Sequence, residues 1–251
     1  MRDLLLIGIG PGDPRQVTYE AVDALRRATV FFVIDKGSDK DELISLRKAI
    51  VERYRPQGGY RLVQVADPRR DAEAADYVTA VQDWHRQRAA LYARLIADEM
   101  SSDDIGAFLL WGEPGLYDST LRILQLVRER GVSLRLQVIP GISSVQALAA
   151  RHQVPLNRIG EPLVVLPGRR LAQQGQIDNV VVMLDGQCAF ARIDDPGLVI
   201  YWGAYLGTED EVLIAGPLQA VKGRILQVRE EARGRKGWIM DTYLLRRELW
   251  T

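Results

Sequence analysis

The sequence predicts an α/β protein with two domains, residues 1–162 around a mainly parallel sheet and residues 163–251 around a mixed sheet. In the first part, short apolar runs alternate with helix-length segments, which is typical of a parallel sheet covered by helices. Glycine-rich turns directly follow three of these runs. From residue 163 on, strand-length runs continue with few long helices between them. This change of pattern indicates a second domain.

The composition is that of an ordinary soluble globular chain, with 251 residues, 47% apolar and 26% charged. The 33 basic and 33 acidic residues balance, so no global charge points to a nucleic acid or a membrane surface as partner. Cys188 is the single cysteine, so we expect no internal disulfide and a cytoplasmic protein. No signal peptide and no apolar run long enough to span a bilayer are evident.

The first glycine-rich turn follows the apolar run Leu4–Ile7, which predicts a buried strand. Gly8, Gly10 and Gly12 allow positive φ or a close approach to a ligand, and Asp13 is expected to cap the next helix. Asp13 occupies the third glycine position of a dinucleotide fingerprint, and no Gly-Lys-Ser/Thr follows. The turn therefore suits a ligand without phosphates, or it simply closes an α/β unit.

The remaining segments of the first domain alternate in the same way. Residue 85, a histidine in the polar helix expected over 71–100, has no metal partner four residues away and is given no role. We expect strands at 30–34, 61–65, 105–111 and 134–139, and helices at 16–27, 42–54, 71–100, 121–130 and 144–150.

Two further glycine-rich turns follow strands of this domain. One spans residues 112–120 after strand 105–111, and the other spans 140–144 after strand 134–139. The carboxyl ends of parallel strands lie at one edge of a sheet, so all three turns can line one crevice. In the second domain we expect strands at 163–166, 180–184, 198–202, 212–215 and 238–245.

Taken in order, the turns IGIGPGDP, WGEPGLY and IPGISS resemble the signature loops of the tetrapyrrole (corrin/porphyrin) methyltransferase family. Within the family, residues 111–120, 146–162 and 202–216 resemble most the members that methylate precorrin-5 at carbon 1 with loss of acetate, giving precorrin-6A. The resemblance implies S-adenosylmethionine as methyl donor, a tetrapyrrole (precorrin) substrate and a homodimer. It also implies a kinked arrangement of two α/β domains with an active-site trough between them.

The same resemblance places the donor-binding positions. We expect no metal site. Two positions depart from the family pattern: Glu113 stands where most members have Asp, and Asp118 stands where many have Gly. The donor-binding positions are Pro11, Trp111, Gly112, Glu113, Leu116, Ser143 and Ser144, with Leu184 or Asp185 and Ala215 or Gly216 by looser alignment.

Loss of acetate requires water to attack an acyl group, so a general base would help. Asp118 and Glu113 are the first candidates, followed by Tyr117 and Glu161. Other roles compete, because Asp118 can stabilise the following helix N-terminus and Glu113 can bind the donor alone. Arginines at 151, 158, 169 and 170 are either partners for substrate carboxylates or solvated surface charges.

Two other functions remain open from the sequence. The nearer alternative is a tetrapyrrole methyltransferase that acts at another macrocycle carbon. A more distant one is a non-catalytic nucleotide-binding α/β protein. A methyltransferase acting on nucleic acid or protein is disfavoured by the balanced charge.

Overall fold

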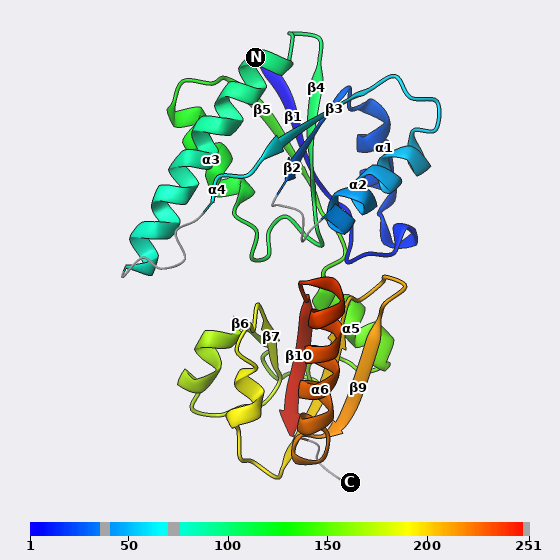
Figure 1. The fold of residues 1–251 in the computed structure, drawn as a ribbon, viewed down its shortest axis with the longest axis vertical. Helices are drawn as coiled ribbons and strands as arrows, with labels where there is room; N and C mark the ends of the chain where they lie inside the picture. Colours follow the sequence, from blue (N-terminus) through cyan, green and yellow to red (C-terminus); the bar gives the residue numbers. More distant parts are fainter. Residues whose placement is uncertain (36–40, 70–75, 248–251) are drawn as a thin grey trace. The chain divides into compact units, whose positions relative to one another are not determined.

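A computed structural model describes residues 1–35, 41–69 and 76–247, and it divides the chain into two compact units (Figure 1). The first unit comprises Met1–Gly10 and Pro14–Ile142, and the second comprises Pro11–Asp13 and Ser143–Thr251. The division after Ile142 differs from the boundary expected after residue 162. The reason is that α5 (Ser144–His152) packs on the sheet strands of the second unit.

The first unit is built on a parallel sheet, as the apolar runs predicted, and its strand order is β3-β2-β4-β1-β5. The inner strand β1 is buried from its third residue to its end, which explains its continuous run of Leu and Ile. The strands are β1 (Arg2–Gly8), β2 (Val30–Asp35), β3 (Arg61–Ala66), β4 (Ile105–Leu110) and β5 (Leu134–Ile139).

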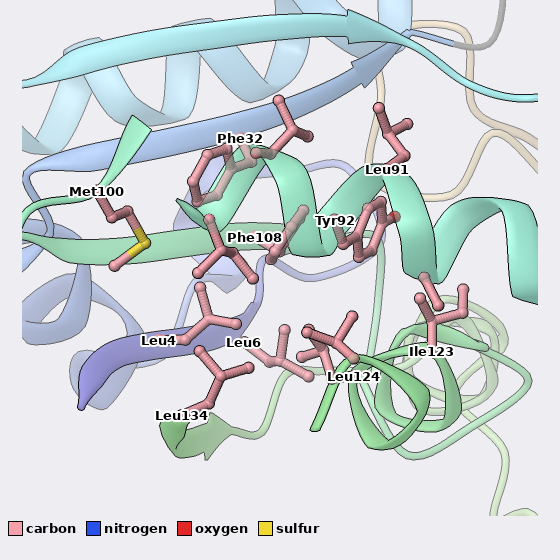
Figure 2. Close-up of a cluster of buried hydrophobic side chains, with 14 of the residues drawn as sticks. Leu4, Leu6, Phe32, Leu91, Tyr92, Met100, Phe108, Ile123, Leu124 and Leu134 are labelled. Carbon is pink, nitrogen blue, oxygen red and sulfur yellow. The ribbon is translucent and has the colours of Figure 1, made fainter. Parts of the chain in front are cut away.

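Helices cover both faces of this sheet (Figure 1). Leu4 and Leu6 of β1 face a core that includes Tyr92 and Leu124, which is drawn in Figure 2. Leu5 and Ile7, which alternate with them along the strand, face the other core. The first core is closed by α3 (Tyr77–Glu99) and α4 (Thr120–Glu129), and the second by α1 (Tyr19–Arg27) and α2 (Asp41–Tyr54).

Two helix starts refine the sequence expectations. Asp13 does not cap α1: the N-cap is Thr18, whose side chain accepts a hydrogen bond from the Ala21 N–H at 3.2 Å. The short 3-10 turn Pro14–Gln16 separates Asp13 from that helix. For the helix expected over 71–100, residues 71–75 lie outside the described residues, and α3 begins at Tyr77.

The neighbouring strands β1 and β4 form the topological switch point of this sheet. The chain leaves β1 toward β2 through α1 on one face, and it leaves β4 toward β5 through α4 on the other face. Ligands of open α/β sheets bind beyond the carboxyl ends of such a strand pair. A ligand site is therefore expected at the loops after β1 and β4.

The second unit contains a mixed sheet, as expected, and its strand order is β6-β7-β10-β8-β9. Among the described strands of this second sheet, only β6 and β7 pair in parallel, and α6 (Leu218–Lys236) packs against β8 and β9. The strands are β6 (Val164–Pro167), β7 (Val180–Met183), β8 (Leu198–Ala204), β9 (Val212–Pro217) and β10 (Asp241–Arg247).

Candidate functional site

The loops that follow β1 and β4 join each other through their backbones. The Gly112 N–H donates to the Gly10 carbonyl at 2.8 Å, and the Gly10 N–H donates to the Gly112 carbonyl at 3.3 Å. Both glycines have positive φ, 78° and 71° respectively. Glycine adopts this conformation without steric cost. The switch point is thus closed by a small main-chain bridge.

The loop after β5 packs directly on the same two loops. A Cβ added at Gly141 would lie 2.1 Å from the Gly112 carbonyl oxygen, and one added at Gly8 would lie 2.6 Å from the Gly141 nitrogen. The atoms that would obstruct either Cβ belong to the backbone, so they cannot move aside as a flexible side chain could. Gly8 and Gly141 are therefore needed for contact between the loops, a requirement that the sequence alone could not distinguish from close approach to a ligand.

Glu113 ties the second loop to the third. Its Oε2 accepts a hydrogen bond from the Gly141 N–H at 3.2 Å, and its Oε1 accepts one from the Gly115 N–H. Both carboxylate oxygens are thus engaged by main-chain donors of glycines. These contacts assign Glu113 a loop-joining role; its donor-binding and catalytic roles stay predictions.

Asp118 lies at the N-terminal end of α4, where its Oδ1 accepts a hydrogen bond from the Thr120 N–H at 2.7 Å. Its other oxygen makes no hydrogen bond within the part of the chain that the structure describes. Tyr117, the preceding residue, has φ 54° and a side chain that is 44% exposed. Trp111 and Leu116 are half-buried in the same loop.

Arg47 is a basic residue of this region that the sequence analysis missed. From α2, its Nε donates to the Leu109 carbonyl of β4 at 3.1 Å and its Nη1 donates to the Leu43 carbonyl at 2.9 Å. Burial lowers the pKa of Arg47, and the Asp118 carboxylate opposes that shift. Nothing in the surrounding segment distinguishes this arginine from a surface residue of the helix.

In the second unit, the turn after β7 has an unusual backbone. Leu184 has φ 53° and is 62% exposed, although it is neither Gly, Asn nor Asp. The next residue, Asp185, is buried, and its Oδ2 accepts hydrogen bonds from the Tyr243 hydroxyl at 2.6 Å and the Ala189 N–H at 2.7 Å. The Asp185 carboxylate therefore serves the turn itself.

A buried ion pair supports this turn from behind. Arg229 of α6 donates from Nη2 to the Asp185 carbonyl at 2.9 Å and from Nε to Asp241 Oδ2 at 2.9 Å. The same Asp241 oxygen accepts from Trp202 Nε1 at 3.0 Å. These side chains lie far apart in the sequence, so local patterns gave no signal for them.

Three other predicted positions of the second unit lie at a helix start or in a loop. Ser143 caps α5, and its hydroxyl and backbone N–H form a capping box with Gln146. Ser144 is the first residue of that helix. Pro11 is buried beside Gly12, where an added Cβ would lie 2.7 Å from Thr208 Cγ2.

Ala215 and Gly216 lie within β9, opposite Tyr201 and Ile200 of β8. Ala215 is exposed and Gly216 has φ 150°. Within the described residues, no group of His, Cys, Asp and Glu has the arrangement of a metal site. No described helix is both long and apolar enough to cross a membrane.

Comparison with known proteins gives one consistent family. The family model of the tetrapyrrole (corrin/porphyrin) methylases matches residues 3–222. A precorrin-6A synthase [deacetylating] of Sinorhizobium sp is 48% identical over 250 residues, covering 98% of this chain and 96% of the relative.

Solved structures agree with this match. A cobalamin synthesis related protein (CobF) of Corynebacterium diphtheriae superposes with a TM-score of 0.86 at 38% identity, covering 98% of this chain and 99% of that one. A uroporphyrin-III C-methyl transferase of Thermus thermophilus, complexed with S-adenosylhomocysteine, shares the fold with a TM-score of 0.54 at 18% identity, covering 96% and 91% of the two chains. With the family model spanning most of its length, the chain belongs to the tetrapyrrole (corrin/porphyrin) methylases.

Proposed function

We propose that this chain is an S-adenosylmethionine-dependent C-methyltransferase of aerobic cobalamin biosynthesis. It methylates precorrin-5 at carbon 1 and releases acetate, giving precorrin-6A. The observation that carries the proposal is the 48% identity, over 98% of the chain, with a precorrin-6A synthase [deacetylating]. By likeness to the family, we also propose that the protein is cytoplasmic and forms a homodimer. Light scattering of the purified protein tests the dimer.

The chemistry of the glycine-rich loops is compatible with S-adenosylmethionine as donor. The stretches 8–14, 111–117 and 139–144 contain no lysine or arginine, and the donor carries no phosphate that would need one. A relative by fold, the Thermus thermophilus enzyme, was solved with S-adenosylhomocysteine. Main-chain groups of tight turns suit such a ligand, because they can lie close to it without side chains in between.

Several proposed donor contacts involve main-chain atoms, since their side chains already have partners. This holds for Glu113, Ser143 and Asp185, whose polar atoms accept hydrogen bonds inside the protein. The exposed Leu184 side chain can pack on an apolar part of the donor. The complete proposed set is Pro11, Trp111, Gly112, Glu113, Leu116, Ser143, Ser144, Leu184, Asp185, Ala215 and Gly216.

The base for acetate loss is assigned by the same reasoning. Asp118 ranks first because one of its oxygens makes no hydrogen bond with described residues, whereas both oxygens of Glu113 are engaged. Tyr117 is exposed beside Asp118 and stays the third candidate. Methyl transfer itself needs mainly that the nucleophilic carbon and the donor methyl be held in line.

The test is a turnover assay with precorrin-5 and S-adenosylmethionine. We expect one S-adenosylhomocysteine and one acetate per precorrin-6A formed, counted by mass spectrometry and by NMR. Formation of S-adenosylhomocysteine without acetate would instead assign methylation at another macrocycle carbon. Binding of NAD(H), with no calorimetric heat from S-adenosylhomocysteine, would favour a non-catalytic nucleotide-binding protein.

A further inference from the structure

Arg47 occupies a gap in the hydrogen bonding of the first sheet. The pairing of β2 with β4 ends at Phe32 and Phe108, while β1 and β4 stay paired through Gly8 and Leu110. The Leu110 carbonyl accepts from a donor on the β1 side, so the Leu109 carbonyl, one residue earlier, points toward β2. Arg47 donates to that carbonyl, beyond the last β2 partner. The guanidinium therefore lies at the carboxyl edge of the sheet.

This guanidinium has donors left over. Two main-chain carbonyls accept hydrogen bonds from Arg47, and no carboxylate in the described part of the chain forms an ion pair with it. Arg55, just beyond the end of the same helix, instead spreads its hydrogen bonds over five main-chain carbonyls. Arg88, which is fully buried in this unit, is paired with Asp67 at 2.8 Å, whereas Arg47 is half-buried. The half-buried Arg47 cation therefore has donors that can take an anion.

An acidic residue, Asp118, lies in the loop that follows the same strand, at the N-terminal end of α4. The Asp118 carboxylate interacts electrostatically with Arg47, yet it forms no ion pair with it and keeps one oxygen without a hydrogen bond among the described residues. Tyr92, buried from α3, stacks on Phe108 of the same strand with ring centroids 4.7 Å apart. At the carboxyl end of β4, Arg47 has N–H donors and Asp118 has a carboxylate oxygen that make no hydrogen bond with described residues.

We propose that Arg47 and Asp118 form the acyl-hydrolysis subsite, in which Arg47 binds the oxyanion and then the acetate product while Asp118 activates water. The inference rests on the proposed function, which requires an acyl group to leave as acetate. A guanidinium matches both anions, since it offers parallel N–H donors to carboxylate-like oxygens.

The bond changes are as follows. Asp118 accepts a proton from water as the water oxygen bonds to the acyl carbon, and the carbonyl electrons move to an oxyanion that Arg47 stabilises. When this intermediate collapses, the bond between the acyl carbon and the macrocycle breaks, and its electron pair stays with the macrocycle. Acetic acid leaves as acetate and a proton, and Asp118 returns its proton to solvent. The macrocycle carbanion equivalent then takes the donor methyl group.

The experiment compares single-turnover acetate release in the wild type and in Arg47→Ala. Loss of one oxyanion donor lowers rates by about 10² to 10³-fold, so we expect acetate release to fall by that factor. The affinity for S-adenosylhomocysteine, measured by calorimetry, should stay within about twofold. Arg55→Ala is the matched control, because it also removes contacts from arginine to main-chain carbonyls but at the opposite edge of the sheet, and it should release acetate at the wild-type rate.

Rescue separates chemistry from folding. Added guanidinium ion should restore acetate release to Arg47→Ala, and Arg47→Lys should lie between that variant and the wild type. Acetate release within threefold of wild type in Arg47→Ala overturns the inference, as does a parallel loss of S-adenosylhomocysteine binding without rescue. Failure of the proposed function gives a different result, because the wild type itself would then release no acetate.

Discussion

The sheet edges of the two units satisfy their polar groups in opposite ways. In the first unit, glycine backbones bond to one another, while Arg47 and Asp118 keep hydrogen-bonding capacity unused by described residues. In the second unit, Asp185 and Arg229 use their polar atoms within the turn after β7 and the strands behind it. The first edge thus keeps polar groups unused, which our proposal assigns to a ligand, whereas the second edge uses its charges to fix the shape of a turn.

The largest expected effect comes from breaking the buried pair of the second unit. Arg229→Leu leaves the Asp241 carboxylate without its cation and the Asp185 carbonyl without its donor. Removing one partner of a buried ion pair costs about 3 to 5 kcal/mol, so the free energy of unfolding should fall by that amount. Hydrogen exchange on peptides of residues 180–190 measures the change where it should be largest.

The matched control lies on the same helix. Arg235 pairs with Asp210 at 3.2 Å, but its side chain is 64% exposed. Exposed ion pairs contribute about 0 to 1 kcal/mol, so Arg235→Leu should change stability little. Equal losses in Arg229→Leu and Arg235→Leu would mean that the buried pair does not hold the turn.

A smaller effect is expected from the backbone contacts of the first unit. Gly141→Ala places a Cβ against the Gly112 carbonyl oxygen. This clash is relieved only if the two loops move apart. Overpacking of this kind costs about 1 to 3 kcal/mol, so we expect a loss near the upper end and faster exchange of the Gly112 amide. Gly186→Ala is the control, since no atom lies within 4 Å of an added Cβ there. A harmless Gly141→Ala would show that the loops are not in contact in solution.

The sequence was sufficient for features that depend on local pattern. Apolar runs predicted the strands of both sheets, and the positions of the three glycine-rich turns followed from the strand ends. The cap of α1 was assigned wrongly because Asp13 and Thr18 are both good caps, and the intervening 3-10 turn decides between them.

Tertiary partners could not be derived in the same way. Arg47 and Arg229 read as ordinary helix arginines, because their carbonyl and carboxylate partners come from other elements. The resemblance predicted Leu184 or Asp185 as a donor-binding position, but only the structure reveals that Tyr243 engages the Asp185 carboxylate. Burial and long-range pairing therefore show which predicted positions have side chains that are already engaged inside the protein.

The smallest effect tests whether the turn after β7 is strained. A left-handed conformation costs a residue with a Cβ about 1 to 2 kcal/mol, while glycine loses about 0.5 to 1 kcal/mol more conformational entropy on folding. Leu184→Gly should therefore raise the free energy of unfolding by roughly 0.5 to 1 kcal/mol relative to Leu184→Ala, which keeps the strained backbone. Both variants lose the same exposed side chain, so their difference in urea denaturation isolates the backbone contribution. If the two variants are equally stable, the backbone of Leu184 is not strained, and the network around Arg229 orders the turn without opposing strain. The proposed role of Leu184 then depends on its exposed side chain alone.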